Sequence, residues 1–63
     1  MEQLYTIKEA AQILRVTPGA VYGWVEARQI GCVKVSGRWI RIPSSEIDAF
    51  IQRSFVPAIG GDR

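Results

Sequence analysis

The chain has 63 residues, a formal net charge of +2, one cysteine and no histidine. A chain of this length forms one small domain, whose core needs nearly every large apolar residue and leaves no room for a deep substrate cleft. Because Cys32 has neither a histidine nor a second thiol beside it in the sequence, we expect no disulfide, no metal or cofactor site, no small-molecule substrate and no enzyme.

The first predicted helix begins after Thr6. Thr6 and Glu9 have the Thr-x-x-Glu spacing of a capping box, in which each side chain accepts a hydrogen bond from the backbone of the other residue. At about 100° per residue, one face of this helix is apolar and mostly small. That face carries Ile7, Ala10, Ala11 and Leu14, so another element can pack closely against it.

A second helix is predicted from the capping residue Thr17, with Pro18 in its first turn, to about Ala27 or Arg28. Val16, in the three-residue turn before it, is predicted to be a buried anchor. The stripe facing the core carries Val21, Trp24, Val25 and the stem of Arg28. The opposite face carries Gly19, Tyr22, Gly23 and Glu26, with Ala20 and Ala27 at a flank. Two short helices joined by so short a turn predict a helix-turn-helix.

The segment GCVKVSGRWIRIP predicts a β-hairpin with Ser36-Gly37 as a two-residue turn. That register pairs Val35 with Arg38. It predicts one face with Val33, Val35, Ile40 and Ile42, and an outer face with Cys32, Lys34, Trp39 and Arg41. Three roles stay open for Trp39: stacking under a cation, covering part of the first helix, or contacting a partner protein.

Pro43 is predicted to end the hairpin, and Ser44 or Ser45 to cap a third helix from Ser45 to Arg53. Its apolar stripe would carry Ile47, Phe50 and Ile51. Residues 54–63 include a proline and two adjacent glycines, so we expect a flexible C-terminal tail after a domain over residues 1–53. The order helix, helix, two-stranded wing, helix predicts an α+β, mainly α, winged helix-turn-helix.

The charges are unevenly placed along the chain. No acidic residue occurs from Ala27 to Ser45, a stretch that holds the cations Arg28, Lys34, Arg38 and Arg41. A basic block on a nearly neutral protein favours an edge that binds a polyanion, and a solvated strand surface is the alternative.

The segments LYTIKEAAQILRVTPGAVYGWV and GRWIRIPSSEIDAF resemble the excisionase family of small DNA-binding domains, which are related to the DNA-binding half of MerR-type regulators. The resemblance covers Leu4 to about Ile51. It implies that the second helix enters a DNA major groove, with residues at or near the DNA being Thr17, Gly19, Ala20, Tyr22 and Gly23. The tip of the wing, Ser36, Gly37 and Arg38, would reach the adjacent minor groove or backbone. Arg28, Lys34 and Arg41 from the basic block complete the expected DNA-binding set.

The chain departs from that family at two positions. Family members often carry arginine or another long polar side chain where this chain has Gly19 and Gly23, so direct base readout is expected to be thin. Each glycine costs a helix interior about 1 kcal/mol relative to alanine. We expect the bare face to let the helix backbone approach DNA closely, with Ala20 available to a thymine methyl and specificity coming largely from the wing and DNA shape. The alternative is that the glycines are merely tolerated.

Two polar residues of the same face are also open to interpretation. The Tyr22 hydroxyl is expected to donate to a phosphate, or else the ring packs on Arg28 or the wing. Glu26 either accepts a hydrogen bond from a cytosine amino group or points clear of the groove.

The resemblance implies an accessory factor of site-specific recombination that binds DNA in tandem, bends it and biases an integrase toward excision. A MerR-type regulator would need a dimerisation helix and an effector domain after the third helix, and the sequence ends about ten residues after it. The alternatives are a small transcription regulator on the same fold and a protein-interaction module using Trp39 and the tail. Expected partners are duplex DNA, further copies of the chain arranged head to tail, and an integrase. No secretory signal and no apolar run of about 20 residues is recognisable, so a cytoplasmic setting without a membrane partner is expected.

Overall fold

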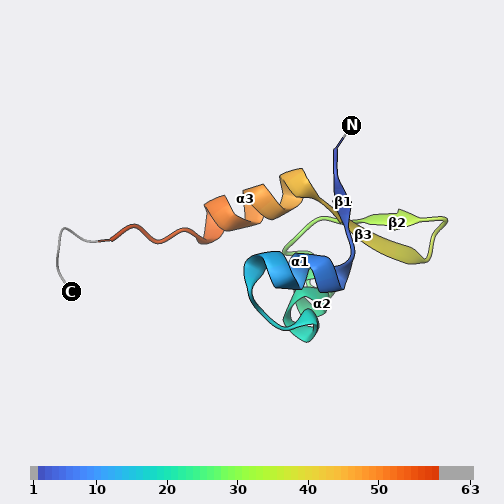
Figure 1. Cartoon of the computed structure of the whole chain (residues 1–63), viewed down its shortest axis with the longest axis horizontal. Coiled ribbons are helices and arrows are strands. Elements are labelled where there is room, and N and C mark those ends of the chain that lie inside the picture. Colours follow the sequence, from blue (N-terminus) through green and yellow to red (C-terminus); the bar gives the residue numbers. More distant parts are fainter. Residues whose placement is uncertain (1, 59–63) are drawn as a thin grey trace.

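The computed structural model describes residues 2–58. The elements in chain order are β1 (Leu4–Tyr5), α1 (Ile7–Leu14), α2 (Pro18–Glu26), β2 (Val33–Val35), β3 (Trp39–Pro43) and α3 (Ser44–Ser54) (Figure 1). The strands form an antiparallel sheet in the order β1-β3-β2, so β3 pairs with both of its neighbours. Three helices and a small sheet of this topology confirm the α+β, winged helix-turn-helix fold expected from the sequence.

Both N-terminal caps predicted for the first two helices are present. The Thr6 side chain accepts from the Glu9 backbone N–H at 3.0 Å, and the Glu9 carboxylate accepts from the Thr6 N–H at 2.9 Å. Thr17 caps α2 by accepting from the Ala20 N–H at 3.2 Å. These bonds, reciprocal in α1 and single in α2, satisfy backbone donors that a helix start leaves without partners, which explains why both helices begin where the sequence predicts.

The core lies where α1, α2, β3 and the start of α3 meet. Its buried side chains are Ala10, Ala11, Val21, Val25, Ile30, Ile42 and Ile47. At its edge the half-buried Trp24 lies against Phe50, with ring centroids 4.7 Å apart. The fully buried residues of α1 are both alanines, so α2 packs close to α1 and the opposite side of α2 faces outward.

Two residues predicted to be buried beside α2 lie at the surface instead. Val16 is 38% exposed, and its N–H bonds to the Ala11 carbonyl, which closes the C-terminal end of α1. Arg28 is exposed and takes a left-handed conformation with φ 61°, which turns the chain out of α2. Ile30, two residues further on, fills the core position that the stem of Arg28 was expected to cover.

The hairpin register predicted from the sequence is wrong by one residue. Ser36 and Gly37 do form the turn, with φ of 54° and 77°, and the Arg38 N–H bonds to the Val35 carbonyl at 3.2 Å. However, Val35 pairs with Trp39 rather than with Arg38, so the loop has the three residues Ser36–Arg38. One residue of slip turns a strand over. The outer face therefore carries Val33, Val35, Trp39 and Arg41, and the inner face carries Cys32, Lys34, Ile40 and Ile42.

The start of α3 depends on residues from the other end of the chain. Pro43 ends β3 as predicted, but it also pairs with Leu4 of β1, a strand that was not among the predicted elements. Neither Ser44 nor Ser45 is the N-cap of α3; Pro43 holds that position and has no side-chain acceptor. Instead the Glu2 carboxylate accepts from the Ser45 N–H at 2.9 Å and from the Ser45 hydroxyl at 2.5 Å.

Helix α3 runs through Ser54, one residue beyond the predicted end. In its predicted stripe Ile47 is buried and Phe50 half-buried, whereas Ile51 is 42% exposed. Residues 55–58 form neither helix nor strand, and the rest of the predicted tail, residues 59–63, lies outside the described residues. Within residues 2–58 no helix is both long and apolar enough to cross a membrane.

Candidate nucleic-acid interface

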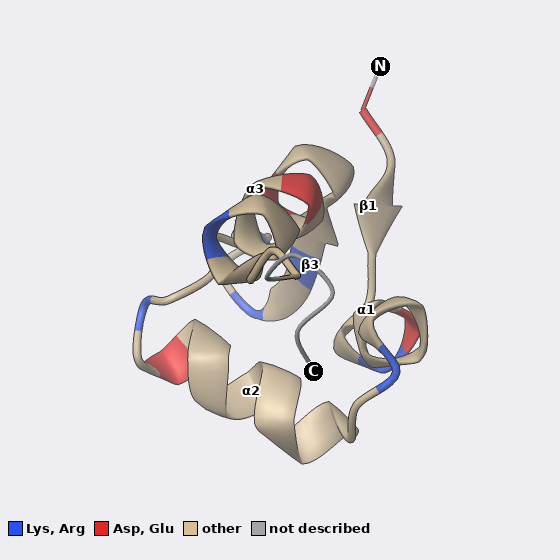
Figure 2. Cartoon of the chain, turned by 90° about the vertical axis from the view of Figure 1, so that its left-hand side faces the viewer, with Lys and Arg blue, Asp and Glu red and all other residues tan. Residues whose placement is uncertain are grey.

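The outward face of α2 has little side-chain material. As predicted, Gly19, Tyr22, Gly23 and Glu26 are all exposed. A methyl group built on Gly23 meets no atom of residues 2–58 within 4 Å outside its own helix backbone, and one built on Gly19 comes no closer than 4.0 Å to the Thr17 hydroxyl. Figure 2 shows α2 free of charged residues except at its C-terminal end, where Glu26 lies. The result is an open helix surface on which the backbone itself is accessible.

Neither glycine of α2 is explained by the fold. Both have helical backbone angles, since the only glycine with a positive φ in residues 2–58 is Gly37. Neither lies against another element, so no close packing requires them. The two glycines therefore destabilise the helix by about 1 kcal/mol each relative to alanine, and no contact with another element within residues 2–58 compensates for that loss.

The two polar side chains at the C-terminal end of the α2 face, Tyr22 and Glu26, lie one helical turn apart and are both exposed. The nearby Glu26 carboxylate raises the pKa of Tyr22 above its ordinary value of 10.0, because it accepts hydrogen bonds from the protonated phenol and because its negative charge disfavours a phenolate. The Tyr22 hydroxyl therefore stays protonated at neutral pH.

The tip of the hairpin presents one cation beside an aromatic ring. Ser36, Gly37 and Arg38 are all exposed, and the guanidinium of Arg38 lies over the Trp39 ring, 5.1 Å from its centroid. Trp39 is 54% exposed. Of the three roles left open for Trp39, stacking under a cation is therefore realised, and it holds the Arg38 charge at the end of the wing.

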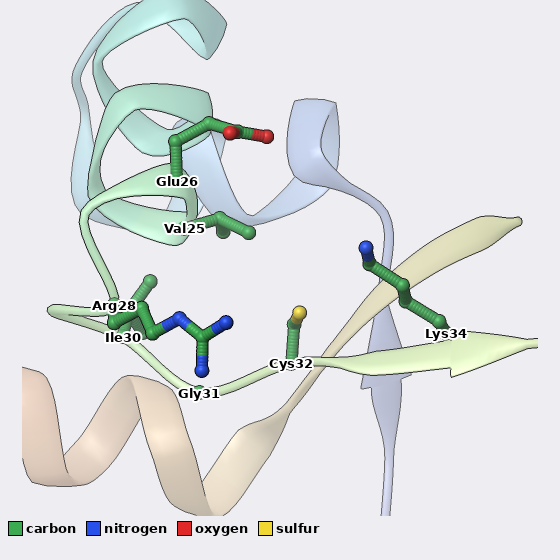
Figure 3. A pocket seen from close by; sticks show the side chains of 7 residues that line it. All are labelled: Val25, Glu26, Arg28, Ile30, Gly31, Cys32 and Lys34. Carbon is green, nitrogen blue, oxygen red and sulfur yellow. The ribbon is translucent and has the colours of Figure 1, made fainter. Parts of the chain in front are cut away.

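A hollow of about 390 Å³ separates the C-terminal end of α2 from the start of β2. Glu26 lies on its helix side, whereas the Arg28 side chain runs along the loop toward Gly31 and the Lys34 amino group rises from β2 (Figure 3). Cys32 is half-buried between them, with its sulfur directed into the hollow. The loop that carries these residues is held to α3 by a 3.0 Å bond from the Gly31 N–H to the Glu46 carboxylate. No cluster of three metal-ligating side chains occurs within residues 2–58.

The observed register divides the cations of the basic block between two surfaces. Lys34 lies on the inner face of the hairpin and lines the hollow, as Arg28 does from the loop. Arg41 lies on the outer face, where its guanidinium donates to the Ile40 carbonyl at 2.8 Å. The sequence-predicted residues therefore form three groups, namely the α2 face, the hollow and the wing tip, with Arg41 apart from the hollow.

Comparison with protein families places this geometry in context. A family described as "Helix-turn-helix domain" matches residues 4–54, the stretch from the start of β1 to the end of α3. The chain belongs to this helix-turn-helix family. Comparison with curated proteins and with solved structures gives no match. A helix-turn-helix domain is a DNA-binding module, so the chain is a DNA-binding protein of this family, with α1, the turn at Arg15–Thr17 and α2 as its helix-turn-helix.

Proposed function

We propose that this helix-turn-helix domain is an excisionase-like accessory factor that binds duplex DNA in tandem, bends it and directs an integrase toward excision in the cytoplasm of a bacterial cell. The observation that carries the proposal is the open glycine face of α2 next to a hairpin that ends in an exposed arginine. These are the two surfaces that the resemblance to excisionases assigns to the major groove and to the adjacent minor groove or backbone.

The dimensions of α2 suit a major groove. An α-helix with its side chains is about 10–12 Å across, which matches the major-groove width of about 12 Å. With its glycines toward the bases, the helix backbone approaches more closely than side chains would allow. The proposed contacts on this helix are Thr17, Gly19, Ala20, Tyr22 and Gly23.

The cations supply the backbone contacts in this proposal. Arg28 and Lys34 flank the hollow between α2 and the wing, the place where a DNA strand passes from the major to the minor groove. The tip residues Ser36, Gly37 and Arg38 follow along the same path. Arg41 lies on the other face of the hairpin and would contact a phosphate only from that side.

Tandem binding follows from the poor base readout. One domain with a bare recognition helix binds a single site weakly, so useful occupancy requires several copies that raise one another's local concentration on the duplex. The molecule measures 48 Å along its longest axis. The hairpin of β2 and β3 and the segment that follows α3 lie toward opposite ends of that axis (Figure 1). Each carries an exposed apolar side chain, Trp39 in β3 and Phe55 after α3. A contact between unlike ends is head to tail and open-ended, as an array along DNA requires.

The first experiment is a gel-shift titration of wild-type protein against duplex DNA at low and high salt. Affinity should fall steeply with salt, because cations that contact phosphates release counterions. The Arg38→Ala variant should bind more weakly by at least about 1 kcal/mol, the scale of a charge-assisted contact. Lys8→Ala, which removes the same charge from the exposed side of α1, is the control and should have a smaller effect. Affinity that does not change with salt would refute DNA binding through phosphates and favour a protein-interaction module.

A second experiment separates an excisionase from a transcription regulator, which would use the same contacts. Sedimentation of the free protein should show a monomer, and affinity per site should be higher on a three-site duplex than on a one-site duplex. If a recombinase is encoded beside the gene, adding it should further stabilise the complex on the flanking DNA. A stable free dimer, or equal affinity per site on both duplexes, would favour a dimeric regulator.

A further inference from the structure

The loop between α2 and β2 is held to α3 at two backbone groups. The Arg53 guanidinium donates to the Gln29 carbonyl at 2.6 Å, and the Glu46 carboxylate accepts from the Gly31 N–H at 3.0 Å. Ile30, between these two loop residues, is buried in the core. The approach of α3 to the loop is close, since a methyl group built on Gly31 would lie 2.7 Å from the Glu46 carboxylate. Helix α3 therefore fixes the loop from outside the surfaces assigned to DNA.

Arg28, in the same loop, has a backbone conformation that favours glycine. Its φ is 61°, its N–H bonds to the Val25 carbonyl at 3.1 Å, and the Gln29 N–H bonds to the Trp24 carbonyl at 2.8 Å. This is a left-handed turn that commonly ends a helix, and glycine is its usual residue because a Cβ is strained there. Another residue persists in that conformation where the surroundings hold the backbone, and such residues gather at functional sites. Burial does not explain the arginine, since Arg28 is exposed.

The position of the loop decides which surface receives the Arg28 guanidinium. Arg28 lines the hollow beside α2, and it also lines a second hollow on the α3 side of the loop, together with Phe50 and Arg53. Figure 3 shows its side chain running along the loop beside the first hollow. Arg53 itself is held on the α3 side: its guanidinium lies 5.8 Å from the centroid of the Phe50 ring, and that ring lies against Trp24 of α2.

We propose that Arg53 is a positioning residue for DNA binding: by holding the Gln29 carbonyl it fixes the neighbouring backbone of Arg28, so that the Arg28 guanidinium lies ready for a phosphate beside α2. The proposal rests on the proposed function, in which Arg28 contacts the DNA backbone between the major and the minor groove. Arg53 lies on α3 and contacts no DNA in this arrangement. A cation that is already ordered loses less conformational entropy on binding a phosphate than a cation on a free loop.

The test is a double-substitution cycle on DNA affinity, measured by titration of duplex DNA at several salt concentrations. Arg28→Gly should lower affinity by on the order of tenfold, the scale of one lost hydrogen bond to a charged group, and should reduce the slope of log affinity against log salt by about 1. Arg53→Ala should lower affinity by about threefold, the scale of ordering one side chain on binding. In an Arg28→Gly background, Arg53→Ala should have no further effect beyond the loss of its charge.

Lys8→Ala and Arg53→Lys are the controls. Lys8 is exposed on α1, so Lys8→Ala removes the same charge without touching the loop and gives the effect of charge alone. Arg53→Lys keeps a donor for the Gln29 carbonyl and should retain most of the wild-type affinity. Thermal unfolding by circular dichroism checks that each variant folds, and the titrations are done below every unfolding transition. A purely structural role of Arg53 would lower the unfolding temperature and leave the affinity of the folded protein at that of Lys8→Ala.

Three results would overturn this inference and leave DNA binding standing. They are an Arg53→Ala variant that binds as Lys8→Ala does, an equal loss of affinity from Arg53→Ala with and without the Arg28 side chain, and an Arg28→Gly variant with wild-type affinity and salt dependence. Wild-type protein without salt-dependent DNA binding would overturn this inference and the proposed function together.

Discussion

Substitution of Gly23 separates stability from DNA binding. Within residues 2–58, no atom outside the helix backbone lies within 4 Å of a methyl group built there, and the backbone is helical, so neither steric nor conformational strain opposes alanine. Only the helix propensity remains, and it favours alanine by about 1 kcal/mol. In a domain of this size that free energy raises the melting temperature by about 4–8 °C. Gly23→Leu should also melt no lower than wild type, because leucine is almost as good a helix former as alanine.

DNA binding should change in the opposite direction. If the bare face allows close approach of α2, a leucine at Gly23 holds the helix away from the bases and lowers affinity by about tenfold or more, which is about 1.4 kcal/mol. Gln52→Leu on α3 is the control for adding an exposed leucine and should bind normally. Circular dichroism and gel shifts on the same preparations decide the matter. Normal DNA binding by Gly23→Leu would mean that the glycines are merely tolerated, and a lower melting temperature for Gly23→Ala would refute the assignment of open space.

Three further predictions concern the fold. Ile42→Ala, at a fully buried position, should cost about 2–5 kcal/mol in urea unfolding, a large share of the stability of so small a domain; an unchanged midpoint would contradict the assigned core. The hydrogen bond from the Ser45 hydroxyl, and to a smaller extent the one from the Ser45 N–H, lower the pKa of Glu2 below its ordinary value of 4.5. These bonds therefore stabilise the fold above pH 4.5, and this stabilisation is lost as the pH falls through the lowered pKa of the folded state. Glu2→Gln should therefore melt below wild type at pH 7 and lose less stability between pH 6 and 2. Gly31→Ala should lower the free energy of unfolding by about 1 kcal/mol, because the added methyl group would lie 2.7 Å from the Glu46 carboxylate and displace it from the residue-31 N–H. In a Glu46→Ala background the same substitution should cost nothing further, and an equal loss of stability in both backgrounds would refute the coupling.

The helices were predictable because their signals are local. Thr6 with Glu9, and Thr17 with Pro18, lie within four residues of one another and act through the backbone of the same turn. The spacing of glycines along α2 likewise places them on the exposed face whatever the rest of the fold does. These parts of the candidate site could therefore be predicted from the sequence alone.

The hairpin register was not predictable from the same kind of signal. Register is fixed where one strand face is buried, and β2 projects past the core with all three of its residues exposed. Val33 and Val35 were assigned inward because they are apolar, yet a core already filled by Ile30 and Ile42 does not need them. The error moved Lys34 to the wrong face, so that its position at the hollow lined also by Arg28 was not predicted.

The remaining errors concern contacts between distant residues. β1 has two residues and therefore no periodicity to recognise. The cap of α3 comes from Glu2, 43 residues before Ser45, and nothing in the sequence near Ser45 indicates it. Such contacts emerge only when β3 brings the N-terminal segment next to the start of α3.

The two tryptophans give the molecule two separate optical signals. Trp24 is half-buried against Phe50 beside the core, so its ultraviolet emission depends on whether the domain is folded. Trp39 is exposed beneath the Arg38 guanidinium at the wing, so its emission should change when the guanidinium moves away from the ring. A chain with phenylalanine in place of Trp24 retains the second chromophore alone and lets movement of the wing be followed in unlabelled protein.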